Sequence, residues 1–327
     1  MKVSLVKMQE EFQRVLLKWG FSPEKADCCA RIFAENSRDG VYSHGVNRFP
    51  VFVEMIREGL VDPKAEPETV GRFGQWEQWD GRLAPGMYTA SLAIDRSIEL
   101  AKAQGIGAVA VRNTNHWMRG GTYGWKAAEA GCVAICCSNT IANMPPWGAR
   151  DPRLGNNPLV IAIPRPPGHM VLDMAVSQYS YGKLQDYDLR GELLPVAGGY
   201  DLKGELTRDP AQIRASKRIL PIGFWKGSAL SLALDALVSL MSGGLSVAGV
   251  TSQGKEYGLS QLFICLRTEG LDPKVLEEII AYARSSGPLS EKERVQYPGE
   301  QSLAIRKRNE MEGIPVLETI WKQVKEL

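Results

Sequence analysis

The chain has 327 residues, of which 44% are hydrophobic and 23% charged, a composition typical of a folded protein with one large or two medium domains. Its 39 basic and 37 acidic residues give a formal net charge of +2. That balance, without a local run of lysine and arginine, argues against a protein whose main partner is nucleic acid.

The first part of the chain is predicted to be helical. Apolar residues recur at helical spacing after Ser4, which suits an N-cap, and glycine or proline marks the helix ends. The expected helices cover residues 4–20, 23–38 and 46–57. The turn before the third helix carries His44 and Arg48 close to a helix N-terminus, where free backbone N–H groups favour anions.

From about residue 63 the pattern changes to short apolar runs typical of strands, separated by helices. The expected strands cover residues 69–73, 76–80, 108–112, 133–137, 159–163, 170–176 and 261–267. The expected helices cover residues 89–104, a segment from about 122, and residues 227–241, 273–284 and 301–312. The most apolar helical stretch, 228–241, is too short to cross a bilayer and carries Asp235, so we expect no membrane span. The polar, glycine-rich region 187–218 is expected to be an excursion over the surface.

No familiar phosphate-binding loop is found in the sequence. Gly105-Ile106-Gly107 is the only Gly-x-Gly beside a strand, and it precedes that strand, whereas a Rossmann fingerprint follows a strand and opens a helix. We therefore interpret these glycines as the stop of the helix over 89–104. A nicotinamide cofactor would need a scaffold other than the Rossmann fold.

Two of the three histidines lie in dense polar motifs. His44 is followed by Arg48 within residues 42–50, and His116 lies between Asn115 and Arg119, ahead of a glycine pair. Histidine exchanges a proton near neutral pH, and arginine can bind a carboxylate through two parallel hydrogen bonds. Two such motifs in one chain favour catalysis over purely structural histidines.

Asp173 and Lys226 are two further candidates. Asp173 lies in the apolar run 170–176, where an unpaired carboxylate is costly, so we expect it to pair with a histidine and to raise the pKa of that histidine. An exposed strand edge is the alternative for Asp173. Lys226 precedes the helix over 227–241, and a helix N-terminus suits a pyrophosphate, although a solvated lysine would show the same pattern.

The cysteines point to a reducing compartment. Six occur, in a spacing that matches neither a metal-binding knuckle nor a disulfide framework: residues 28, 29, 132, 136, 137 and 265. The first residues lack the apolar stretch of a signal peptide. We therefore expect reduced thiols and a cytoplasmic protein.

These motifs together resemble the type 2 malate/L-lactate dehydrogenase family, which differs from the Rossmann lactate and malate dehydrogenases. The matching motifs follow in order along nearly the whole chain: Ser43-His44-Gly45 with Arg48, Asn115-His116 with its glycine pair, Gly155-Asn156-Asn157-Pro158, Asp173-Met174-Ala175 and Trp225-Lys226-Gly227. The longest similar stretches, 41–50, 115–121, 144–149 and 224–227, resemble family members that reduce a diketo sugar acid.

The resemblance implies an α/β fold with a non-Rossmann nicotinamide-binding domain on a mixed or largely antiparallel sheet. It implies a helical domain made by residues 1–70 with 286–327, a cofactor domain over 71–285, and a homodimer. The implied activity is reduction of a small 2-oxo acid in the cytoplasm with NADH, or alternatively NADPH, without a nucleic-acid or membrane partner.

The resemblance also implies roles for individual residues. His44 would donate a proton to the carbonyl oxygen, and Asp173, Arg48 and His116 would be the other catalytic residues. We expect Asp173 to pair with the His44 ring and to raise the pKa of that histidine. The substrate would be bound by Ser43, Arg48, Asn115 and His116. The cofactor would be contacted by His169, Met170, Val171, Leu172, Asp173, Met174, Ala175, Trp225, Lys226, Gly299, Glu300 and Gln301. No metal ligands are implied.

Three alternatives stay open at this point. The first is another 2-hydroxy acid dehydrogenase of the same family, acting on malate, lactate or ureidoglycolate. The second is a metal-dependent isomerase or lyase with His44, His116 and Asp173 as ligands, because two histidines and one carboxylate can hold a metal ion. The third is a binding protein on the same scaffold, without turnover.

Overall fold

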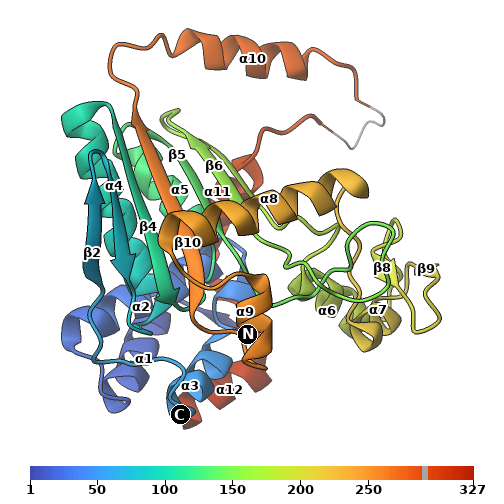
Figure 1. Ribbon diagram of the computed structural model, residues 1–327. Coiled ribbons are helices and arrows are strands. Elements are labelled where there is room, and N and C mark those ends of the chain that lie inside the picture. The colour runs from blue at the N-terminus through green and yellow to red at the C-terminus, as the bar shows by residue number, and fades with distance from the viewer. Residues whose placement is uncertain (289–293) are drawn as a thin grey trace.

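A seven-stranded sheet forms the centre of the computed structural model, which describes residues 1–288 and 294–327 (Figure 1). Its strands are β2 (Glu68–Phe73), β3 (Trp76–Asp80), β4 (Ile106–Thr114), β5 (Cys132–Ser138), β6 (Leu159–Ile163), β7 (Met170–Met174) and β10 (Leu259–Arg267). Their order is β2-β3-β4-β10-β5-β6-β7. Within this sheet β3 and β4 run parallel, and the other neighbouring strands run antiparallel. The prediction of a mixed, largely antiparallel sheet in an α/β fold is confirmed.

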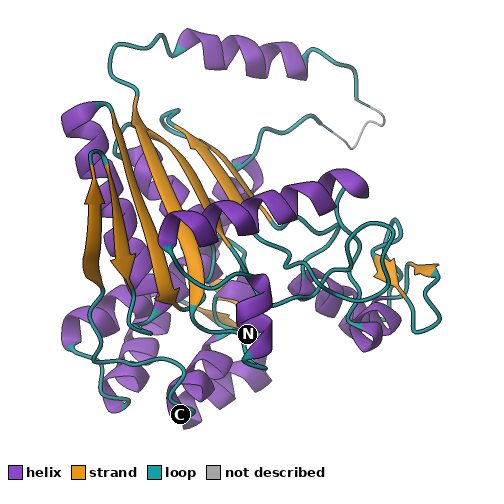
Figure 2. Cartoon of the chain, viewed as in Figure 1, coloured by secondary structure: helices purple, strands orange, loops and turns teal. Residues whose placement is uncertain are grey.

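Helices cover both faces of the sheet, as Figure 2 shows. α4 (Gly86–Gln104) and α5 (Gly121–Glu129) pack on one face, and α8 (Trp225–Ser242), which leads into α9 (Val247–Ser252), packs on the other. Successive residues of a strand point to opposite faces. Phe263 of β10 therefore lies in the core under α4 and α5, whereas its neighbour Leu262 lies in the core under α8.

The Gly105-Ile106-Gly107 turn joins α4 to β4, as predicted. Gly105 ends the helix with φ of 89°, a conformation that favours glycine. At Gly107 an added Cβ would lie 2.4 Å from the Ser97 carbonyl oxygen. The two glycines therefore stop a helix and let it lie close against its strand.

Helices from both ends of the sequence share a second core. It is formed by α1 (Leu5–Lys18), α2 (Pro23–Arg38), α3 (Phe49–Arg57) and α12 (Glu318–Glu326). Within it Phe12 stacks on Phe49 with ring centroids 4.2 Å apart, and Trp321 of α12 packs edge-on against Phe12. β1 (Lys2–Val3) pairs with β11 (Ile314–Pro315) beside this core. Ser4 caps α1 as predicted, and the domain boundaries that we placed at residues 70 and 286 stay a prediction.

The region predicted as a surface excursion is part of a small folded lobe, residues 178–220, at the right of Figure 1. The lobe contains α6 (Tyr181–Arg190), β8 (Gly199–Tyr200), β9 (Leu206–Thr207) and α7 (Pro210–Ser216). Its buried side chains Leu184, Leu194, Ile213 and Ile219 share a core with Met144 and Leu154 of the segment between β5 and β6. The sequence did not reveal these elements because each contributes only one or two buried apolar residues, too few for a visible period.

Two further predicted helices lie between the sheet and α12 in the sequence. α11 (Glu300–Glu312) packs against α2, and α10 (Lys274–Arg284) stands away from the sheet at the top of Figure 1. A two-pronged ion pair between Arg165 and Glu277, with N–O distances of 2.7 and 2.9 Å, ties α10 to the loop before β7. Among the described residues, no helix is long and apolar enough to span a membrane.

Candidate active site

Two loops bring His44 and His116 together. His44 ends a single 3-10 turn, η1 (Tyr42–His44), between α2 and α3, and His116 lies in the loop between β4 and α5. Their rings are stacked, with centroids 5.6 Å apart and planes at 26° to each other. The two motifs that the sequence singled out therefore form one site.

Both rings are hydrogen-bonded through Nδ1. The backbone N–H of Met118 donates to His116 Nδ1 over 2.9 Å, and Ser43 Oγ lies 3.1 Å from His44 Nδ1. Because Nδ1 of His116 accepts a hydrogen bond, the neutral ring carries its proton on Nε2. His116 therefore offers an N–H donor at Nε2.

The site consists of two neutral rings beside a cation. Burial, reinforced by the charge of Arg48, lowers the pKa of His116 to about 3. Burial also lowers the pKa of His44 to about 3, with further contributions from His116, Arg48 and Arg119. Arg48 itself, at the N-cap of α3, forms no ion pair with a carboxylate of the described residues. An unneutralised guanidinium next to N–H donors attracts an anion.

Asp173 does not pair with His44, contrary to our expectation. Its Oδ2 accepts a hydrogen bond of 2.8 Å from the Gly121 N–H and lies 3.8 Å from Arg119 Nε. Gly121 begins α5, so the carboxylate lies at a helix N-terminus, where negative charge is favoured. Burial raises the pKa of Asp173, and Arg119 and the Gly121 N–H partly offset that rise. The predicted increase in the pKa of His44 was wrong because the carboxylate that should cause it binds elsewhere.

The glycine pair before α5 is the signal that could have revealed this arrangement. An added Cβ at Gly121 would lie 2.7 Å from Asp173 Oδ2, so only glycine leaves room for the carboxylate. A glycine at the start of a helix, together with an acidic residue in an otherwise apolar strand, is a pattern compatible with such a contact.

Asp39 is a residue that the sequence did not single out. Its carboxylate, 3% exposed, binds Arg119 at 2.6 Å, Arg306 at 2.7 and 2.8 Å, and the adjacent Arg38 at 2.9 Å. Burial opposes ionisation, but the hydrogen bonds and charges of Arg306, Arg119 and Arg38 together lower the pKa of Asp39. The cluster ties α2, the loop that carries His116 and α11 to one another. No spacing marks Asp39, because two of its partners lie far away along the chain.

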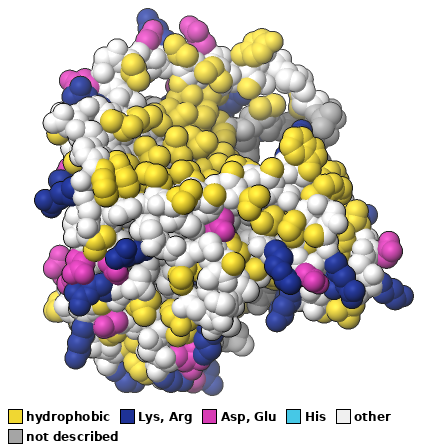
Figure 3. All heavy atoms as spheres, viewed as in Figure 1, with side chains coloured by type: hydrophobic (Ala, Val, Ile, Leu, Met, Phe, Trp, Pro, Cys, Tyr) yellow, Lys and Arg dark blue, Asp and Glu magenta, His cyan; other side chains and the backbone are white. Residues whose placement is uncertain are grey.

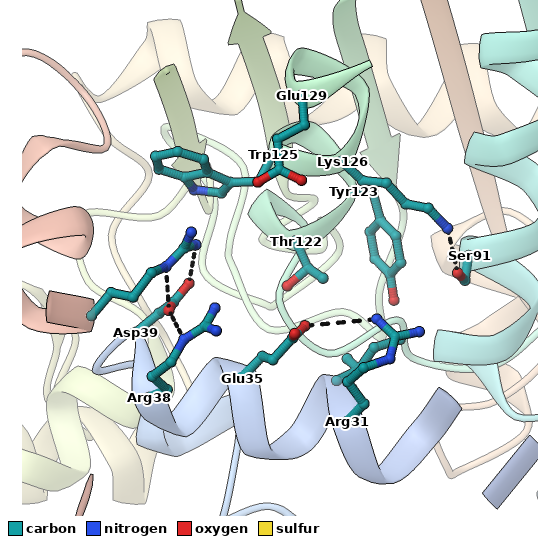
Figure 4. Close-up of a pocket in the computed structure, with 12 residues that line it drawn as sticks. Arg31, Glu35, Arg38, Asp39, Ser91, Thr122, Tyr123, Trp125, Lys126 and Glu129 are labelled. Carbon is teal, nitrogen blue, oxygen red and sulfur yellow. Dashed lines mark hydrogen bonds and ion pairs between the residues drawn. The ribbon is translucent and has the colours of Figure 1, made fainter. Parts of the chain in front are cut away.

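A cavity of about 330 Å³ lies beside this cluster, between α2 and α5 (Figure 4). Arg31 and Glu35 of α2 line it on one side and Trp125 and Lys126 of α5 on the other, while Asp39 lies at one end. None of the predicted site residues lines this cavity. The cavity therefore adjoins the Asp39 cluster and is not part of the histidine site.

Asn115, predicted to bind substrate, is an anchor for the His116 loop in the structure. The side chain is 1% exposed, and its NH₂ donates to the carbonyl oxygens of Leu60 at 3.1 Å, Leu83 at 3.0 Å and Ala84 at 3.3 Å. The backbone carbonyl oxygen of Asn115 accepts a hydrogen bond of 3.0 Å from the Gln261 side chain. These contacts fix the backbone immediately before His116.

The residues predicted to contact the cofactor begin along β7, the edge strand of the sheet. The Val171 N–H donates to the Pro298 carbonyl oxygen over 2.8 Å, which places the start of α11 beside β7. The next residue, Gly299, has φ of 95°, and an added Cβ there would lie 3.1 Å from both the His169 carbonyl oxygen and the Val171 nitrogen. Glycine is therefore required where the two segments meet.

The start of α8 lies beyond the other end of β7. The Ile222 N–H donates to the Val176 carbonyl oxygen over 3.0 Å, which brings the turn before α8 next to the strand. α8 begins at Trp225, which is 61% exposed, and Lys226 follows. The N–H groups of Lys226 and Gly227 are bonded to the carbonyl oxygens of Gly223 and Ile222, so this end of α8 would attract a phosphate through the helix dipole and the lysine charge. Segments 169–175, 225–226 and 299–301 thus form one strip along β7 and beyond its two ends.

Two side chains of this strip are engaged within the protein. Glu300 binds Arg284 at 2.7 Å and Arg294 at 3.1 Å. His169 is 7% exposed, accepts a hydrogen bond from the Arg165 N–H at Nδ1, and packs edge-on against Trp125. Both support the neighbouring backbone, whereas Gln301 is exposed.

The geometry does not favour the metal-dependent alternative. In residues 1–288 and 294–327, no three histidine, cysteine, aspartate or glutamate side chains are grouped so as to hold a metal ion. Because Asp173 accepts a hydrogen bond from Gly121, its carboxylate does not converge with His44 and His116, as that alternative requires.

Comparison with known proteins places the chain in a family. The chain matches the family described as malate/L-lactate dehydrogenase over residues 3–325. It is 46% identical, over 334 aligned positions covering 100% of both chains, to a protein of Citrobacter koseri named 2,3-diketo-L-gulonate reductase. Its fold matches that of malate dehydrogenase from Entamoeba histolytica with a TM-score of 0.93 at 25% identity, and 100% of this chain and 96% of that one are covered. Sulfolactate dehydrogenase from Methanocaldococcus jannaschii gives a TM-score of 0.90 at 27% identity, with the same coverage.

Proposed function

Because this chain belongs to the malate/L-lactate dehydrogenase family, we propose that it reduces a 2-oxo acid with a hydride from a nicotinamide cofactor. Membership makes it an oxidoreductase that acts on a hydroxy or oxo acid. The proposed substrate is 2,3-diketo-L-gulonate, reduced to 3-dehydro-L-gulonate in carbohydrate metabolism, because relatives 46% identical over their full length are named for that substrate. The observation that carries the proposal is the pair of neutral histidines beside an unneutralised arginine.

Each residue of the pair has a distinct task in this reaction. Reduction of a ketone needs a hydride at carbon, which the bound cofactor supplies, and a proton at oxygen. His44 donates that proton, and the Nε2–H of His116 hydrogen-bonds an oxygen of the substrate. Arg48 binds the substrate carboxylate through two parallel hydrogen bonds.

The low pKa of His44 suits an acid that is charged only when substrate is present. A substrate carboxylate on Arg48 brings a negative charge close to both rings. An opposite charge nearby favours the imidazolium and raises the pKa towards ambient pH, where proton donation is most efficient. Protonation of the acid is thereby coupled to binding of an anion.

The cofactor is proposed to bind along the strip formed by residues 169–175, 225–226 and 299–301. The start of α8, with Lys226, supports a phosphate position, and the close approach of Gly299 to β7 supports backbone contact along the strand. NADH is the proposed cofactor and NADPH the alternative.

A homodimer is proposed for the active protein. Figure 3 shows hydrophobic side chains gathered on the face that carries α8 and α10. Exposed apolar side chains on these two helices include Leu232, Leu237, Leu240, Val275, Ile279 and Tyr282. Large exposed apolar patches are typical of protein interfaces, and a second copy of the chain would cover this one.

A reducing compartment, the cytoplasm, is the proposed location. All six cysteines lie in the part of the chain that the structure describes, and each is free. Five of them are buried, four of these in the sheet. Thiols that are buried in the cores serve as small apolar side chains and need no oxidising environment.

Loss of reduced-nicotinamide absorbance with a panel of 2-oxo acids tests the proposal. We expect turnover with 2,3-diketo-L-gulonate to exceed that with oxaloacetate, pyruvate and the oxo acid of ureidoglycolate, for NADH and NADPH in turn. His44→Gln should lower kcat at least about 100-fold while cofactor affinity changes little, because it removes the titrating proton and keeps the side-chain shape. A His44→Gln variant with near-normal kcat would move the acid role to His116. Cofactor binding without turnover of any acid would instead favour a binding protein, and inactivation by a chelator a metalloenzyme.

A further inference from the structure

The first turn of α6 contacts Ser43, the residue before His44. An added Cβ at Gly182 would lie 2.6 Å from Ser43 Cβ and 2.9 Å from Ser43 Oγ. Neither atom belongs to the far end of a long, flexible side chain, so neither can move aside cheaply. Glycine at position 182 is what lets the lobe lie directly on Ser43.

Ser43 in turn contacts the catalytic ring. Its Oγ lies 3.1 Å from His44 Nδ1, and the hydroxyl forms no other hydrogen bond to the described residues. A hydroxyl can donate to the lone pair of a neutral ring and can accept from the N–H of a charged one. When it donates to Nδ1, the proton of the neutral ring stays on Nε2.

The chain enters and leaves the lobe that carries Gly182 through two adjacent segments. Where the chain enters and leaves the lobe, the Gln178 N–H donates to the Leu220 carbonyl oxygen over 2.8 Å, and Ser177 forms a β-bridge with Pro221. The core of the lobe also includes Met144 and Leu154 of the segment between β5 and β6, and the Ile219 N–H donates to the Asn143 carbonyl oxygen. The lobe is therefore packed on that segment, which keeps α6 against Ser43.

We propose that Ser43 is a positioning residue, clamped between the Gly182 backbone and the His44 ring. Its hydroxyl donates a hydrogen bond to Nδ1, so that the proton that His44 transfers stays on Nε2. The lobe maintains this clamp through Gly182. The inference rests on the proposed role of His44 as the proton donor. It assigns Ser43 to the ring instead of to the substrate.

The ring tautomer of His44 can be read directly by NMR on the full-length protein labelled with ¹⁵N in histidine. Only three histidines are present, so His116→Gln and His169→Gln variants assign the signals. Near neutral pH, the wild type should show His44 as a single neutral tautomer protonated at Nε2. Ser43→Ala should give a mixture of tautomers, and Ser43→Thr, which keeps the hydroxyl, should restore the single form.

The contact with the lobe is tested by Gly182→Ala against Gly287→Ala as a matched control, because an added Cβ at Gly287 meets no atom within 4 Å. Gly182→Ala should mix the tautomers, whereas Gly287→Ala should match the wild type. If Gly182→Ala also lowers Tm, the double variant Ser43→Gly/Gly182→Ala tests the cause, because it removes the Ser43 Cβ that the new Cβ at position 182 would meet. Recovery of Tm with the tautomers still mixed supports the clamp, and failure to recover overturns the contact.

Kinetics give an independent readout. Loss of one neutral hydrogen bond should lower kcat about 10-fold in Ser43→Ala and in Gly182→Ala, with KM for the 2-oxo acid changed less than about twofold. Wild-type tautomer and kcat in Ser43→Ala would overturn the proposal. A wild-type protein that reduces no 2-oxo acid would refute the proposed function instead, and the tautomer result would distinguish the two failures.

Discussion

Binding of an unreactive 2-oxo acid analogue should draw a proton onto His44. In the free protein the pKa of His44 is about 3, so the ring is neutral at pH 6. A carboxylate held on Arg48 at about 4 Å from the ring contributes roughly 4 kcal/mol at an effective dielectric constant of about 20. Since about 1.4 kcal/mol is a factor of 10, the proton affinity of His44 rises roughly 1000-fold, enough for about half of the sites to take up a proton at pH 6.

Calorimetry measures this uptake. Oxalate is titrated into the enzyme with reduced cofactor at pH 6, in two buffers of different ionisation enthalpy, and the difference in heat gives the protons taken up per site. His44→Gln should abolish the uptake, and His116→Gln should retain most of it. Zero uptake in the wild type would show that His44 works as a neutral donor, and full uptake in His44→Gln would move the charge to His116. Either result refutes the coupling between anion binding and protonation.

Three further predictions concern the charged residues around the pair. Arg48→Lys should lower kcat/KM about 10- to 100-fold, or roughly 1.5–3 kcal/mol, because it loses the bidentate fork; equal impairment with a ketone that lacks the carboxylate would make Arg48 structural. Asp173→Asn should leave the alkaline limb of the pH profile of kcat/KM unchanged, since the carboxylate contacts Gly121 and Arg119. A limb moved to lower pH would instead show that Asp173 pairs with His44. Asp39→Asn should lower the free energy of unfolding by roughly 3–5 kcal/mol at pH 7, measured with urea, because it leaves buried arginines uncompensated. As the pKa of Asp39 is lowered by folding, its stabilisation is complete above the ordinary aspartate pKa and is lost as pH falls through the folded-state pKa; a variant that loses as much stability on acidification as the wild type would contradict this.

The sheet and most helices could be predicted because their sequences have a strong period. α1, α8 and β10 each lie within about two residues of the expected ranges. α6 and α7 were missed, since a lobe with one small core needs few apolar residues and glycine and polar residues hide them. α12 was missed as a separate helix because it is a short polar segment that buries only Trp321 and Val324.

The candidate site was predictable as a set of residues and much less as a set of contacts. His44, His116 and Arg48 stood out because they lie in dense polar motifs and their side chains can exchange a proton or bind an anion near neutral pH. Periodicity cannot show that Asp173 reaches Gly121, because a strand pattern specifies a face and leaves the partner on another element unspecified. Asp39 had no signal at all, since three arginines converge on it only after the helices have packed.

The core shared by helices from both ends of the sequence has a consequence for synthesis. A ribosome releases α1, α2 and α3 long before α11 and α12, yet Phe12 needs Trp321 and Asp39 needs Arg306. Part of the apolar surface of α1, α2 and α3 therefore stays exposed to solvent while the whole sheet is translated and folds. A chain interrupted within the sheet would carry both histidines and still fail to hold them, so catalytic competence arrives only with α11 and α12. The order of synthesis thus prevents an incomplete chain from forming the site, and truncated products should be inactive and prone to chaperone binding.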